Sequence, residues 1–149
     1  MRITTKGRYA LRAVLQLSMQ EEDKPVSIRT LSELEEISAE FLEQIFFRLR
    51  KAGLISSTRG PGGGFQLIKS LDKITIAEIF EAVGEELHFS PCTLDDGKPC
   101  AREPFCPAHS FWEYTYSMFR EYFRSVTLDD IVNKRYPEQL MAPLEKMSK

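Results

Sequence analysis

The sequence is poor in histidine and cysteine, and it contains no long hydrophobic run. Of its 149 residues, three are cysteine, two are histidine and one is tryptophan. No apolar stretch approaches the ~18 residues that are needed to span a bilayer. The N-terminal stretch MRITTKGRYALRAVLQLSM is interrupted by Arg8 and Arg12 and is followed by no small-residue cleavage site. We therefore expect a cytoplasmic protein that does not enter a membrane.

Signatures of catalysis are also missing. The glycines of RGPGGG are not followed by the Gly-Lys-Ser/Thr triplet of a phosphate-binding loop. The sequence shows no pattern that would pair a nucleophile with a general base, and no pair of carboxylates typical of acid-base chemistry. An enzyme is thus the class of protein that the sequence favours least, and we expect no catalytic residue.

The composition is that of an ordinary globular chain, but its charge is unevenly distributed. Hydrophobic residues make up 42% and charged residues 28%, which argues against wholesale disorder. Residues 1–70 carry 11 Lys and Arg against 8 Asp and Glu, whereas residues 71–149 carry 9 against 14. The net charge of −2 is therefore the sum of +3 in residues 1–70 and −5 in residues 71–149. Only residues 1–70 have the positive charge that favours binding to a polyanion.

Helical periodicity and turn signals in residues 1–70 predict a winged helix-turn-helix. Apolar residues predict a first helix from about Thr5 to Met19, and Ser27 and Ser38 are placed to cap the next two. Leu42, Ile45, Phe46 and Leu49 would form the buried stripe of the third helix, which Gly53 ends. LISST and FQLIK then read as two short strands around RGPGGG.

The second half predicts a long helix that lies outside this domain. Thr75 and Glu78 form a capping box for a short helix, and HSFWEYTYSMFREYFRS predicts a helix from about Pro107 to Ser125. Two apolar stripes run along it, which favours a homodimer. One stripe gives the predicted dimer contacts Trp112, Tyr116, Phe119 and Phe123, and the other is Phe111, Tyr114, Met118 and Tyr122.

The predicted fold class is thus mainly α with a small β-hairpin wing, and we divide the chain into three parts. Residues 1–70 are the winged helix-turn-helix DNA-binding domain. Residues 71–135 hold a cysteine loop and the dimerisation helix, with Thr127 capping a short helix near the end. Residues 136–149 form a flexible tail, because they contain prolines and scattered charge.

The third helix and the wing carry the candidate contacts to double-stranded DNA. In the major groove, glutamine pairs with adenine, glutamate accepts a hydrogen bond from the cytosine amino group, and an aromatic ring packs on a thymine methyl. Basic side chains bind phosphates or enter a minor groove. The candidates are Glu40, Phe41, Glu43, Gln44, Arg48, Arg50, Lys51 and Arg59. The alternative is an ordinary helical hairpin in which Phe41 and Phe47 belong to the core.

All three cysteines lie in one polar loop that is interrupted by prolines. Cys92, Cys100 and Cys106 have seven and then five residues between them, and His109 follows three after Cys106. In a reducing compartment, clustered thiols favour a metal or redox role over a disulfide. Four such ligands suit tetrahedral zinc or a two-iron cluster, although the absence of a CxxC pair disfavours zinc. Three unrelated thiols, with His109 packed beside Trp112, are the alternative.

These segments together resemble a known family. MRITTKGRYALRAV, FLEQIFFRLRKAGLISSTRGPGGGF and CPAHSFW are similar to the Rrf-two family of bacterial winged-helix regulators, and most to its iron-sulfur cluster regulator branch, IscR. The resemblance implies a homodimer crossed by the long helices. It also implies a [2Fe-2S] cluster on Cys92, Cys100, Cys106 and His109, whose state alters which promoters are bound.

Two departures from the family pattern bear on the cluster. The first gap is seven residues here, whereas the family pattern has five, so the loop is longer and more acidic. The nitric-oxide-sensing branch binds [4Fe-4S] with a carboxylate from the partner's first helix, a place that Arg8 takes here. Arg8 cannot ligate iron, which favours the two-iron cluster.

The sequence therefore predicts a DNA-binding transcription regulator, of the repressor class, that senses iron, cluster or redox status. One alternative keeps the winged helix but makes the loop a zinc or thiol-redox site. The other is a protein-interaction module whose aromatic helix recruits an enzyme.

Overall fold

The computed structural model describes residues 3–20, 24–88, 90, 93 and 100–136 of the chain. Three helices open the fold: α1 (Thr5–Ser18), α2 (Ile28–Glu35) and α3 (Ala39–Lys51). Each begins at a hydroxyl cap, because the side chains of Thr4, Ser27 and Ser38 accept from a backbone N–H in the first turn. The start of each helix agrees with its predicted cap, and α1 ends one residue before the predicted Met19.

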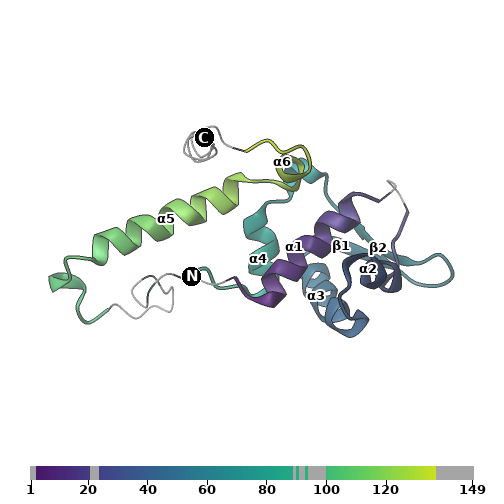
Figure 1. The fold of residues 1–149 in the computed structure, drawn as a ribbon, viewed down its shortest axis with the longest axis horizontal. Coiled ribbons are helices and arrows are strands. Elements are labelled where there is room, and N and C mark those ends of the chain that lie inside the picture. The colour runs from purple at the N-terminus through teal and green to yellow at the C-terminus, as the bar shows by residue number, and fades with distance from the viewer. Residues whose placement is uncertain (1–2, 21–23, 89, 91–92, 94–99, 137–149) are drawn as a thin grey trace, which may run out of the picture.

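The wing is an antiparallel hairpin of β1 (Ile55–Thr58) and β2 (Gly64–Leu67), which projects from the edge of the domain (Figure 1). Ile55 lies opposite Leu67 and Thr58 opposite Gly64. Gly64 has no room for a side chain, since a Cβ would lie 2.4 Å from the backbone of Val26. Val26 pairs with Phe65 there, so the hairpin is joined to the residues that precede α2.

One hydrophobic core joins the helices to the wing. The predicted stripe of α3, Leu42, Ile45, Phe46 and Leu49, is fully buried. It packs with buried residues of α1 and with the following helix α4 (Ile76–Val83), which lies against α1. The core is thus continuous across residue 70, the predicted boundary between the first two parts of the chain.

The chain returns to this core after a long helix, α5 (His109–Ser125). Ile76 donates its N–H to the Val126 carbonyl at 3.0 Å, and Leu128 donates to the Ile74 carbonyl at 2.9 Å. The short 3-10 helix η1 (Leu71–Lys73) and the helix α6 (Leu128–Val132) flank this pairing. The C-terminal end of α5 is therefore fastened to the start of α4.

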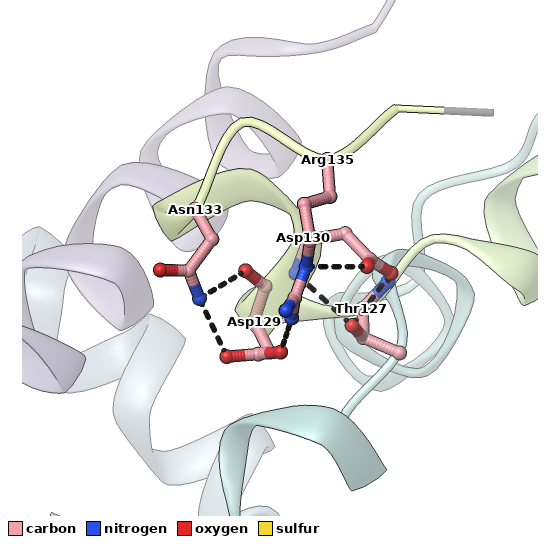
Figure 2. Close-up of polar contacts among 5 residues, drawn as sticks. All are labelled: Thr127, Asp129, Asp130, Asn133 and Arg135. Carbon is pink, nitrogen blue, oxygen red and sulfur yellow. Dashed lines mark hydrogen bonds and ion pairs between the residues drawn. The ribbon is translucent and has the colours of Figure 1, made fainter. Parts of the chain in front are cut away.

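A group of polar contacts shapes α6 (Figure 2). The Thr127 hydroxyl and N–H both donate to the Asp130 carboxylate, and the Asp130 N–H donates back to Thr127, which completes the predicted cap. Asn133 donates to Asp129 at 2.7 Å, and Arg135 pairs with the same carboxylate. The cap satisfies the N–H groups of Thr127 and Asp130 at the start of this five-residue helix, and at its end the Asn133 side chain also donates to the Asp129 carbonyl at 3.0 Å.

The N-terminal part of α5 extends away from the winged domain (Figure 1). Near its other end, the Phe123 ring packs edge-on against Phe80 of α4, with 5.5 Å between the centroids. No residue of α5 is fully buried, and Phe111, Tyr114 and Met118 are 60%, 68% and 51% exposed. In the described part of the chain, no helix is both long and apolar enough to cross a membrane.

The cap of α4 makes stability depend on pH. Burial raises the pKa of Glu78, but hydrogen bonds from Lys69 and Thr75 and the charge of Lys69 outweigh it, so the pKa is lowered. The unfolded chain then takes up this proton at a higher pH than the folded protein, so the stabilisation is present at neutral pH and is lost on acidification.

We expect Glu78→Gln to lower the free energy of unfolding at pH 7 by about 0.5–1 kcal/mol, because glutamine keeps the cap but loses the charge. Urea unfolding of both proteins at pH 7 and near pH 3 measures the effect. The difference should shrink in acid, and an equal difference at both pH values would contradict this account.

Candidate nucleic-acid interface and metal centre

The face of α3 opposite the core is polar and exposed. The exposed residues of this part of the helix include Glu40, Glu43, Gln44, Phe47 and Lys51, each of which lies three or four positions from another of the set. Glu40, Glu43 and Gln44 lie in the first half of the helix, where the recognition helix of a helix-turn-helix meets base edges. The structure therefore brings the predicted base-reading residues together on one surface.

The two phenylalanines of this helix have different environments. Phe41 is half-buried and lies edge-on to Tyr9 of α1, with 5.8 Å between the ring centroids. Phe47 is 59% exposed. Phe41 thus anchors α3 to α1, which limits its access to a base, while Phe47 is not part of the core.

The predicted basic contacts do not form one cluster. Arg50 donates to the Ser57 hydroxyl at 3.0 Å and lies over the Phe47 ring, so it braces α3 against β1. Arg48 points toward Gly84 at the end of α4. Lys51 is exposed in the last turn of α3, and Arg59 is exposed at the tip of the wing. All four side chains are exposed, and Arg48 and Arg50 differ from the other two in lying close to another part of the fold.

Three of the four predicted metal ligands are placed by consecutive turns. The Cys100 carbonyl accepts from the Glu103 N–H at 2.9 Å, Glu103 accepts from Cys106 at 3.4 Å, and Cys106 accepts from His109 at 3.2 Å. The middle turn is the 3-10 helix η3 (Glu103–Phe105). Cys100 and Cys106 are half-buried free thiols, and Cys92 lies outside the described residues.

His109, the first residue of α5, has a ring nitrogen without a partner. Its Nδ1 is the one buried side-chain nitrogen or oxygen in the described part of the chain that makes no hydrogen bond. Burying a polar atom without a hydrogen bond costs about 1–3 kcal/mol of stability, so an atom of this kind calls for a partner such as a bound ligand or a water. Its Nε2 lies 3.5 Å from Glu103 Oε1 and 3.9 Å from Glu113 Oε2.

This donor set fits an iron-sulfur cluster. Thiolate sulfur and imidazole nitrogen are ligands of such clusters and of zinc, and no hydrogen bond within the described residues occupies Nδ1. Among the described residues alone, no three His, Cys, Asp or Glu side chains already converge to hold a metal ion. His88, the other histidine, bonds the Thr93 carbonyl at 3.0 Å and stacks on Tyr116, which is a structural role.

The predicted dimer residues differ in their surroundings. Tyr116 and Phe123 contact the same chain, at His88 and Phe80. Trp112 is half-buried beside Phe111, and Phe119 lies near Phe123. The second stripe is the more exposed one, so α5 presents it, rather than the first, as the open apolar surface.

A buried carboxylate links the cysteine segment to α1, and sequence reasoning missed it. Glu85 follows α4, is only 7% exposed, and accepts from the Thr4 N–H at 2.7 Å and from the Thr4 hydroxyl. Gly7 makes room for it, because a Cβ there would lie 2.6 Å from Glu85 Oε2. A glycine inside a strong helical pattern was the available signal, since it often marks a close approach.

Known proteins resemble this chain along most of its length. Residues 3–134 match the Rrf2 family, described as an iron-dependent transcriptional regulator. The HTH-type transcriptional regulator IscR of Pectobacterium carotovorum is 38% identical over 135 residues, which are 91% of this chain and 81% of that protein. IscR of Escherichia coli O1:K1 is also 38% identical over 135 residues, covering 91% of this chain and 82% of its own length.

Solved structures agree in fold. CymR, the global cysteine regulator of B. subtilis, superposes with a TM-score of 0.72 at 30% identity, covering 90% of this chain and 98% of that one. IscR of T. potens superposes with a TM-score of 0.70 at 28% identity, covering 90% and 88%. The predicted fold class, mainly helical with a hairpin wing, is confirmed.

The contact between Gly7 and Glu85 predicts that Gly7→Ala destabilises the protein, whereas the same substitution in an ordinary helix stabilises it. Gly→Ala in a helix usually stabilises by about 1 kcal/mol. Here Gly7→Ala would push the Glu85 carboxylate off Thr4 and lose bonds worth about 1.5–3 kcal/mol, so we expect a net loss near 1 kcal/mol. Urea unfolding at a fixed protein concentration measures it.

The matched test repeats the substitution in a Glu85→Ala background. With the carboxylate gone, Gly7→Ala should stabilise by about 1 kcal/mol. Stabilisation by Gly7→Ala in both backgrounds would show that Glu85 does not constrain the residue.

Proposed function

The chain belongs to the Rrf2 family of DNA-binding transcription regulators, and we propose that an iron-sulfur cluster on Cys92, Cys100, Cys106 and His109 controls its binding to promoters. The observation that carries the proposal is the buried, unpartnered Nδ1 of His109. It stands at the end of the turns that begin at Cys100 and pass through Cys106.

We favour a [2Fe-2S] cluster over [4Fe-4S]. Three thiolates and one imidazole supply two ligands to each of two irons. Arg8, on the first helix, offers no lone pair to iron. These four side chains would hold the cluster, which would supply single-electron transfer.

The residues around the loop support a path from this centre to the DNA-binding helices. On one side, Glu85 ties the segment that leads into the loop to Thr4, at the start of α1. On the other side, α5 begins at His109 and ends at the backbone pairing of Val126 with Ile76. A change in the shape of the loop therefore reaches α1 and α4, both of which pack against α3.

A homodimer would turn that change into altered DNA affinity. The exposed apolar side chains of α5, with Trp112 and Phe119 beside them, would pack against the same helix of a second copy. Dimers of helix-turn-helix proteins bind half-sites about one DNA turn apart, so the angle of α5 sets the spacing of two α3 helices. Small shifts in that spacing change which operators fit.

On DNA, Glu43 and Gln44 would read base edges in the major groove, and Arg59 would enter the minor groove from the wing. Their exposure and their positions in the first half of α3 and at the tip of the hairpin support these roles. Arg48, Arg50 and Lys51, which are exposed in the second half of α3, would contact phosphates, and Arg50 also ties α3 to β1 through Ser57.

We expect Cys92→Ala, Cys100→Ala and Cys106→Ala each to abolish the visible absorption and the bound iron and sulfide of protein purified without oxygen. The variants should remain folded dimers, because the described cysteines lie outside the core. Absorption spectra, metal analysis and sedimentation measure this. Zinc in place of iron, or variants that bind every promoter as the parent does, would contradict the cluster mechanism.

Replacing Gln44 or Arg59 by alanine should weaken operator binding by about 1–3 kcal/mol for each lost base contact. Lys73→Ala, an exposed basic residue on η1, serves as the control and should leave the affinity nearly unchanged. Titration of a fluorescent operator at fixed salt measures the affinities. Full affinity in both variants would remove these residues from the interface.

A further inference from the structure

The imidazole of His109 has two unlike sides. Nε2 faces the carboxylates of Glu103 and Glu113, at 3.5 Å and 3.9 Å, whereas Nδ1 is buried and has no hydrogen-bond partner among the described residues. Glu103 comes from the turn between Cys100 and Cys106, and Glu113 stands one turn along α5. Carboxylates from two separate elements therefore lie close to the same nitrogen, Nε2.

A neutral imidazole carries one proton, and its surroundings decide which nitrogen holds it. A proton on Nε2 points toward two acceptors, whereas a proton on Nδ1 would have none in the described part of the chain. The carboxylates thus favour the form in which Nδ1 keeps a free lone pair. Histidines that bind metals commonly donate their other N–H to a carboxylate or carbonyl in this way.

We propose that Glu103 and Glu113 are positioning residues that hold the Nε2 proton of His109, so that Nδ1 is the atom that binds iron. This inference rests on the proposed cluster. The distances of 3.5 Å and 3.9 Å are long for hydrogen bonds, so the carboxylates act here mainly through their charge. The same two charges oppose the arrival of an electron and lower the reduction potential of the centre.

Both carboxylates can be changed without disturbing the core. The side chains of Glu103 and Glu113 are 46% and 69% exposed. A double Glu→Ala variant removes the acceptors, while a double Glu→Gln variant keeps an acceptor oxygen of the same reach and removes only the charge. Glu121→Gln, another exposed glutamate of α5, is the matched control.

The first experiment needs no metal. Long-range ¹⁵N–¹H correlation spectra of the apo protein, labelled on histidine, report which ring nitrogen carries the proton. We expect His109 to be protonated on Nε2 in the parent and in Glu121→Gln, and the preference to be lost in Glu103→Ala/Glu113→Ala. Protonation on Nδ1 in the parent, or an unchanged preference in the double alanine variant, would overturn the inference.

The second experiment uses the anaerobically purified, cluster-bearing protein. Pulsed electron paramagnetic resonance of the reduced centre, with ¹⁵N placed selectively at Nδ1 of histidine, should show a strongly coupled Nδ1 that disappears in His109→Ala. The reduction potential should rise in Glu103→Gln/Glu113→Gln and stay unchanged in Glu121→Gln. Strong coupling from Nε2, or equal potentials in all three proteins, would overturn the inference.

The two proposals fail in different ways. Protein that holds no iron, or a cluster with no histidine nitrogen coupled to it, removes the assignment of His109 as a ligand. A cluster that is coupled through Nε2 keeps that assignment and removes only the role of the two glutamates.

Discussion

The residues that flank the cysteine segment on both sides are attached to the core of the DNA-binding domain. At its start, Glu85 accepts two hydrogen bonds from Thr4, a residue 81 positions earlier in the chain. At its end, the residues after α5 pair with the start of α4, through Val126 and Ile76. Glu85, Ile76 and Val126 are buried, so the described residues on either side of this segment are held to α1 and to α4.

The two attachments, one at Glu85 and one after α5, depend on different kinds of interaction. The attachment at Glu85 is polar: it is a charged group held by two donors, with Gly7 leaving space for it. The attachment after α5 combines backbone pairing with the packing of Phe123 on Phe80. An apolar contact tolerates small sliding, whereas a buried carboxylate with missing donors is costly. In the mechanism proposed above, the contact of Glu85 with Thr4 is therefore the attachment that a shift of the loop would break at the greatest cost.

Most of the fold was predictable because its signals are local. The caps Ser27, Ser38 and Thr127 and the capping box of Thr75 act on residues three positions away, so they can be read from the sequence. The candidate site was predictable only in part. That Glu43 and Gln44 lie away from the core follows from the helical periodicity of the buried stripe, but the surroundings of Arg48 and Arg50 do not. Arg50 is held by a hydrogen bond to Ser57 of β1, and Arg48 lies near Gly84 at the end of α4.

The sequence by itself determined the class of the protein: a winged helix-turn-helix of basic character, followed by three thiols, an imidazole and an aromatic helix. Spacing and capping carry that information, since they depend on neighbours along the chain. Only the tertiary structure decided that Glu85 reaches Thr4, that Phe41 packs on Tyr9, and which nitrogen of His109 is buried. Those outcomes depend on the free energy of packing residues that are far apart in sequence, and no local pattern records it.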